Sequence, residues 1–120
     1  MEREKTMFYS SAYGVEGITP QELKTKIQSG DDFMLLDVRT PLENAAQVIE
    51  GSYLLPIQEL PARLAELPKD RDIVVYCRIG NRSAYACMYL ARMGYRVKNL
   101  EGGIRSWNTQ ESTSLTRAWL

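Results

Sequence analysis

Apolar residues along the chain fall into short continuous runs and helical stripes, which succeed one another. Residues 33–38 and 73–76 are mainly apolar, show no regular alternation with polar residues and are too short for helices. Runs of this kind are typical of strands covered on both faces. Residues 51–56 and 96–100 are predicted to form two more short strands.

Two capping boxes mark the starts of helices. Residues 19–22 and 40–43 each place Thr at the N-cap, Pro at the first helical position and Glu at the third. The first helix is predicted to bury Leu23 and Ile27 and to end near residue 29. The second is predicted to be short and to run toward residue 48, directly after the first buried strand.

Three later segments have helical spacing. A narrow leucine stripe covers residues 60–67, and a last helical turn anchored by Trp107 covers residues 104–108. Between them, residues 83–93 carry a stripe at helical spacing that ends before a glycine. The residues of that stripe are Ala84, Cys87, Met88 and Ala91.

Alternating strands and helices predict an α/β fold, an open parallel sheet of about five strands with helices on both faces. We expect residues 17–108 to form the domain, with an N-terminal extension over 1–16 and a C-terminal tail over 109–120, neither of which has clear periodicity. Ligands of such sheets bind beyond the carboxyl ends of the strands. Asp37 and Cys77 both lie at such ends and are candidates to share one crevice.

Composition narrows the function. The 120 residues carry 15 basic and 15 acidic side chains, so no overall field attracts nucleic acid or an anionic membrane. No signal segment or membrane-spanning run is present, which predicts a soluble, cytoplasmic protein. With two cysteines and no histidine, neither a disulfide framework nor a usual zinc or haem site is expected, and mechanisms that need an imidazole base are excluded.

Cys77 is the candidate nucleophile. It follows a strand and precedes a glycine-containing loop that opens a helix, so unpaired backbone amides should point at its sulfur. Arg78 and Arg82 add positive charge, and together these features favour the reactive thiolate. The alternative is a small, inert core residue. Cys87, in contrast, falls on the apolar helical stripe and is predicted to pack in the core.

Several short motifs then recur in one order between residues 18 and 108. They are Asp37-Val38-Arg39, Glu43, Gly51, Pro56, the loop Cys77-Arg78-Ile79-Gly80-Asn81-Arg82-Ser83, and Leu100-Glu101-Gly102-Gly103 with Trp107. In this order and spacing they resemble the signatures of rhodanese domains, the single-domain thiosulfate sulfurtransferases.

The resemblance implies a sulfurtransferase without a cofactor. Cys77 would carry a persulfide, and the substrate-binding loop would be formed by Arg78, Ile79, Gly80, Asn81 and Arg82, with Arg82 closing it. Asp37 and Arg39 would support the site, although a purely structural ion pair explains them equally well. Glu43 is better explained as a capping residue.

The chain also departs from the family pattern. Gln47-Val48-Ile49 stands where members commonly have Gly-His-Ile, and Asn44 stands where an aromatic residue often follows the glutamate. Neither position supplies the nucleophile, so these departures concern packing more than chemistry.

Two other classes of function remain open. A cysteine phosphatase or arsenate reductase uses a C-x5-R loop, one residue longer than the interval from Cys77 to Arg82. A non-catalytic binding or regulatory module would keep the fold but often lacks the cysteine. The partners expected for the favoured reading are a small anionic donor such as thiosulfate or a protein persulfide, and a thiol or cyanide acceptor.

Overall fold

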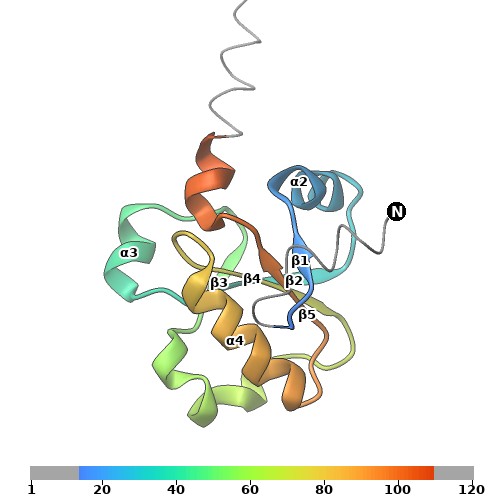
Figure 1. Ribbon diagram of the computed structural model, residues 1–120, viewed down its shortest axis with the longest axis vertical. Coiled ribbons are helices and arrows are strands. Elements are labelled where there is room, and N and C mark those ends of the chain that lie inside the picture. The colour runs from blue at the N-terminus through green and yellow to red at the C-terminus, as the bar shows by residue number, and fades with distance from the viewer. Residues whose placement is uncertain (1–13, 110–120) are drawn as a thin grey trace, which may run out of the picture.

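A computed structural model describes residues 14–109. Its centre is a five-stranded, fully parallel sheet with the order β1-β5-β4-β2-β3 (Figure 1). The strands are β1 (Gly17–Ile18), β2 (Phe33–Asp37), β3 (Ser52–Leu54), β4 (Asp72–Tyr76) and β5 (Val97–Leu100). The predicted open parallel sheet is confirmed. Most of the predicted N-terminal extension and C-terminal tail lie outside the described residues.

Helices connect the strands. The α-helices are α2 (Pro20–Gln28), α3 (Pro41–Ala46) and α4 (Asn81–Arg92), and residues 103–109 form a further helix. Two 3₁₀ segments, η1 (Ile57–Glu59) and η2 (Pro61–Glu66), lie between β3 and β4. Every connection between neighbouring strands therefore crosses over a face of the sheet, as parallel pairing requires.

Alternate residues of the central strands β2 and β4 enter two separate cores. The first core joins Val75 and Cys77 to Leu90 of α4, to Leu60 between η1 and η2, and to the partly buried Leu64 of η2. The second core joins Tyr76 to α2 and to the helix over 103–109. Helices thus cover both faces of the sheet, and Figure 1 shows α2 and α4 well separated in space. For the site this means that Tyr76 and Cys77, although adjacent, face different cores.

Both predicted capping boxes are present. The Thr19 hydroxyl accepts from the Glu22 amide at 3.0 Å, and the Glu22 carboxylate accepts from the Thr19 amide at 3.0 Å. Thr40 and Glu43 repeat this arrangement at 3.1 and 3.0 Å. These reciprocal bonds fix where α2 and α3 begin.

Four local expectations were wrong or incomplete. Ile27 is 42% exposed, because α2 buries only its first turns through Leu23. Ala91 is exposed and Met88 only half-buried, because the buried stripe of α4 turns toward other residues, namely Ser83, Ala84, Ala86, Cys87 and Leu90. The leucine stripe forms 3₁₀ turns broken at Arg63 instead of a regular helix, and β1 was not predicted.

Among residues 14–109, no helix is both long enough and apolar enough to cross a bilayer.

Candidate functional site

The loop after β4 is a tight strand-to-helix turn. Cys77 directly follows the last residue of β4, and α4 begins at Asn81. Gly80 is the N-cap of α4 and has φ +111°, a backbone conformation that residues other than glycine rarely adopt. Gly80 lets the chain reverse within a few residues, so the first amides of α4 turn back toward Cys77.

Three polar groups surround the Cys77 sulfur. The backbone amides of Gly80 and Ser83 donate to Sγ at 3.2 and 3.3 Å, and the Ser83 hydroxyl lies 3.2 Å from it. The Cys77 residue is only 1% exposed. Of the amides expected to cradle the sulfur, Gly80 alone among residues 78–82 contacts Sγ in the described part of the chain, and Ser83 lies one residue beyond the predicted loop.

Ser83 and Asn99 extend this arrangement to β5. The buried Ser83 hydroxyl donates to Asn99 Oδ1 at 2.5 Å. Asn99 Nδ2 donates to the Gly80 carbonyl at 3.1 Å. The Asn99 side chain thereby holds both the loop and the hydroxyl that contacts the Cys77 sulfur. Neither residue was proposed from the sequence as part of the site.

A second turn holds the loop from the other side. The Cys77 and Arg78 carbonyls accept from the Ile104 and Arg105 amides at 2.9 and 3.1 Å. Gly103 precedes these amides with φ +61°, and a β-carbon there would lie 2.5 Å from the Cys77 carbonyl oxygen and still closer to that of Arg78. Gly103 is therefore required for the close approach of the two backbones.

Arg82 is paired away from the sulfur. Its guanidinium donates to both carboxylate oxygens of Glu43 at 2.8 Å each. This hydrogen-bonded pair lowers the pKa of Glu43 to about 2 and raises that of Arg82. Glu43 is thus more than a capping residue, because it links α3 to the first turn of α4. Since the pair is internally neutralised, the amides are the main donors directed at Sγ.

Asp37 and Arg39 form a second, buried network. Arg39 donates to both Asp37 oxygens at 2.8 Å, and the two residues are 3% and 0% exposed. The Tyr76 hydroxyl donates to Asp37 at 3.3 Å, and the Arg39 guanidinium lies over the Tyr76 ring. Asp37 pairs in register with Tyr76, so its side chain lies on the face opposite Cys77. The two strand ends are adjacent, but they do not place these side chains in one crevice.

The network instead anchors α3. Asn44 Nδ2 donates to Asp37 at 3.0 Å, and Arg39 donates to the Gln47 carbonyl at 2.7 Å. Asn44 is a position where the chain departs from the family pattern, and its side chain has a structural role here, whereas Gln47 contributes only its backbone carbonyl. Because α3 also carries Glu43, the Asp37–Arg39 pair supports the Cys77 loop indirectly, through the contact between Glu43 and Arg82.

The other predicted loop residues are solvent-facing. Arg78, Ile79 and Asn81 are exposed, and Ile79 is 45% exposed. Their side chains rim the loop while the backbone surrounds the sulfur. The contact between Glu43 and Arg82 was not predicted, although the sequence contains part of the signal for it. Glu43 and Arg82 both lie in the first turn of a helix that follows a strand, and β2 and β4 are neighbours.

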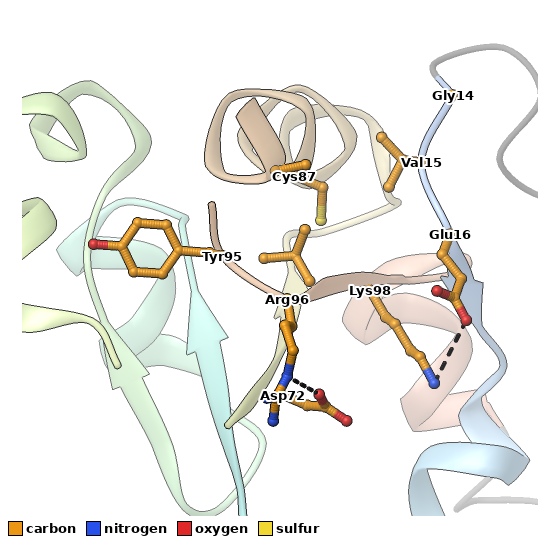
Figure 2. Close-up of a pocket in the computed structure, with 10 residues that line it drawn as sticks. Gly14, Val15, Glu16, Asp72, Cys87, Tyr95, Arg96 and Lys98 are labelled. Carbon is orange, nitrogen blue, oxygen red and sulfur yellow. Dashed lines mark hydrogen bonds and ion pairs between the residues drawn. The ribbon is translucent and has the colours of Figure 1, made fainter. Parts of the chain in front are cut away.

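Cys87 lies in a different environment, as predicted. It is fully buried in the core between α4 and the sheet, and desolvation raises its pKa well above that of a free thiol. Figure 2 shows its side chain directed from α4 toward the sheet, at a pocket of about 450 Å³. The pocket lies at the amino ends of β4 and β5, where Arg96 pairs with Asp72 at 2.9 Å, so it is remote from Cys77.

Comparison with known proteins gives the same assignment over most of the chain. Residues 19–110 match the family model of the rhodanese-like domain. A sulfurtransferase from Allochromatium vinosum is 46% identical over 94 residues, which cover 78% of this chain and 88% of that protein. A rhodanese-related protein from Thermoplasma volcanium superposes with a TM-score of 0.73 at 35% identity, covering 78% of this chain and 91% of that one.

A third relative is larger. The NAD-dependent persulfide reductase of A. fulgidus contains a similar region, with a TM-score of 0.63 and 42% identity. The match covers 78% of this chain but 16% of the reductase. These matches, together with a sulfurtransferase of nearly the same extent, support a role in sulfur transfer. The chain belongs to the rhodanese-like domain family.

Proposed function

We propose that this protein is a sulfurtransferase that carries sulfane sulfur as a persulfide on Cys77. The donor is thiosulfate or another persulfide, and the acceptor is cyanide or a thiol. The observation that carries the proposal is the pair of backbone amides, of Gly80 and Ser83, that donate to Cys77 Sγ at 3.2 and 3.3 Å beside the N-terminus of α4. The proposal extends to a cytoplasmic location and to a catalytic domain over residues 17–108.

Loading needs no general base. The Cys77 thiolate attacks the outer sulfur of thiosulfate, a bond forms between the two sulfurs, and the S–S bond of thiosulfate breaks with its electron pair going to sulfite. No proton moves, which suits a chain without histidine. The oriented amides stabilise negative charge on sulfur throughout the step.

Discharge follows as a separate step. The acceptor's lone pair forms a bond to the terminal sulfur, and the persulfide bond breaks with its electron pair going to Cys77 Sγ. The products are thiocyanate or an acceptor persulfide, and the Cys77 thiolate. The two steps share one covalent intermediate, so double-displacement kinetics are expected.

The small size of the site favours sulfur over phosphate. The loop surrounds Cys77 closely enough to leave it 1% exposed, and the short C-x4-R spacing provides few amides. A persulfide adds one atom to Sγ, whereas a phosphoryl intermediate would add a phosphorus with three oxygens. Arg82, which could bind those oxygens, donates through both Nη atoms to the Glu43 carboxylate.

Initial-rate kinetics test the proposal. Thiocyanate formation is measured while thiosulfate and cyanide are varied, and aryl phosphate hydrolysis is measured on the same preparation. Parallel double-reciprocal lines and no phosphate release are expected. Rapid aryl phosphate hydrolysis without thiocyanate formation, or without sulfur transfer to a thiol, would overturn the proposal.

A further inference from the structure

The Ser83 hydroxyl has one proton and two acceptors within reach. It lies 2.5 Å from Asn99 Oδ1 and 3.2 Å from Cys77 Sγ. Asn99 cannot offer a donor in exchange, because its Nδ2 is bound to the Gly80 carbonyl at 3.1 Å. The hydroxyl can therefore satisfy only one of its neighbours at a time, and its C–O torsion is free to select which.

The charge on Cys77 sets this choice. A protonated Cys77 donates to Ser83 Oγ, and the hydroxyl donates onward to Asn99, so each group is satisfied. A thiolate has no proton to give and is a much stronger acceptor, so the hydroxyl turns to Sγ. In a persulfide, Sγ carries two covalent bonds and is a weak acceptor, so the hydroxyl returns to Asn99.

We propose that Ser83 is a catalytic residue that donates a hydrogen bond to Cys77 Sγ only when this sulfur is an anion, with Asn99 as the positioning residue that receives the bond otherwise. This inference rests on the proposed persulfide chemistry. The anion is the leaving group when the persulfide bond breaks, so Ser83 accelerates delivery of sulfur to the acceptor. It gives no such help to loading, where the same bond stabilises the attacking thiolate.

Other charges near the sulfur do not supply this selectivity. Arg82 is neutralised by Glu43, and Asp37 lies on the opposite face of the sheet with Arg39. Arg78 is exposed beside the loop, and Cys87 shares the core beneath α4. Among residues 14–109, none of these groups forms a hydrogen bond with Sγ, whereas Ser83 contributes both an amide and a hydroxyl.

The first test measures alkylation of Cys77 against pH in the full chain, with the modified peptide quantified by mass spectrometry. Loss of the hydroxyl in Ser83→Ala should move the half-maximal pH upward by about one unit, the effect of one hydrogen bond to a charged group. Cys87→Ala is the matched control, since it also removes one buried heavy atom from the same face of α4, one turn further along. It should leave the midpoint unchanged.

Asn99→Ala separates positioning from loop support. Without the competing acceptor, the hydroxyl is committed to Cys77, so the midpoint should move downward in the wild-type background. In the Ser83→Ala background the same change should have no effect on the midpoint, because the hydroxyl through which Asn99 acts is absent. The four proteins together form a double-mutant cycle, which isolates the coupling between Asn99 and Ser83. An equal shift in both backgrounds, or an unchanged midpoint in Ser83→Ala, would overturn the inference.

The second test separates the two steps with preloaded protein. Ser83→Ala should discharge its sulfur to cyanide about tenfold more slowly than Cys87→Ala. Loading by thiosulfate, at a pH where both variants are fully thiolate, should not be slower. Slower loading with normal discharge would contradict the assignment. The alkylation experiment requires no sulfur donor, so a protein that never forms a persulfide would refute the proposed function without deciding the role of Ser83.

Discussion

The two cysteines of this chain are equally inaccessible but differ in what surrounds them. Cys77 and Cys87 are 1% and 0% exposed and belong to the same apolar core. Two amides and a hydroxyl contact the first sulfur, whereas burial, with a smaller contribution from the charge of Cys77, raises the pKa of the second. Exposure therefore does not distinguish the two thiols. The directed hydrogen-bond donors at the strand end do, and our proposal that Cys77 is the reactive thiol rests on them.

The largest expected effect comes from replacing each of the two cysteines in turn. Cys77→Ser should reduce sulfur transfer to background, because serine cannot carry the sulfane sulfur. Cys87→Ser should retain transfer and lose about 1–3 kcal/mol of stability, since a hydroxyl enters an apolar site. Thiocyanate formation and denaturant unfolding check the two halves. Equal loss of activity in a folded Cys87→Ser variant would contradict the assignment of roles.

The next largest effect concerns Gly103, in the turn that holds the Cys77 loop. Gly103→Ala should destabilise the protein by roughly 3 kcal/mol, because a left-handed conformation and a clash with two carbonyls add. Gly30→Ala has a similar positive φ of +73° but open space around the β-carbon, so about 1 kcal/mol is expected. Urea unfolding of both variants measures the difference. Equal losses would show that the approach of the two turns is unimportant.

A smaller effect concerns the pair that braces the loop. Because the folded-state pKa of Glu43 is about 2 and the ordinary value is 4.5, its contribution is complete above pH 4.5 and is lost as pH falls toward 2. Glu43→Gln should remove this contribution, on the order of 1 kcal/mol at pH 7 after screening. Glu59→Gln, which breaks an exposed pair with Arg63, is the control. Acid unfolding that is unchanged in Glu43→Gln would contradict this account.

The smallest effect lies in the turn that follows β5. One buried carboxylate oxygen of Glu101 has no hydrogen-bond partner among residues 14–109, and desolvation raises the pKa of Glu101 from 4.5 to about 7. Between these values the unfolded chain binds fewer protons than the folded chain, so stability falls as pH rises from 4.5 to 7 and stays lower above it. Glu101→Gln should therefore gain about 1 kcal/mol at pH 8 and nothing at pH 4. Thermal unfolding at the two pH values measures this, and equal changes would contradict it.

Local signals in the sequence predicted much of the fold. The capping boxes at Thr19 and Thr40, the buried strands and the glycine loop depend on neighbouring residues, and all four strands proposed from pattern are present. β1 was missed because its two residues are too few to show periodicity. Ile27 was misplaced because helical spacing defines a stripe but not how far the covering sheet extends.

The site was predictable in its centre but not in its supports. The position of Cys77 depends on the strand before it and the loop after it, so it could be predicted from neighbouring residues in the sequence. The bond from Ser83 to Asn99 and the pair between Arg82 and Glu43 join separate elements. Such contacts follow from strand order and register, which local sequence does not determine. The same reason explains why Asp37 was expected beside Cys77 but faces the opposite side of the sheet.

Peptide mapping after loading tests the central claim most directly. The protein is incubated with thiosulfate, freed of donor, alkylated and digested under non-reducing conditions, and the peptides containing each cysteine are compared by mass. The account predicts one additional sulfur atom on the Cys77 peptide, removed by cyanide with formation of thiocyanate, and none on the Cys87 peptide. An additional sulfur on Cys87, or on neither peptide after incubation with both thiosulfate and a persulfide donor, would contradict it.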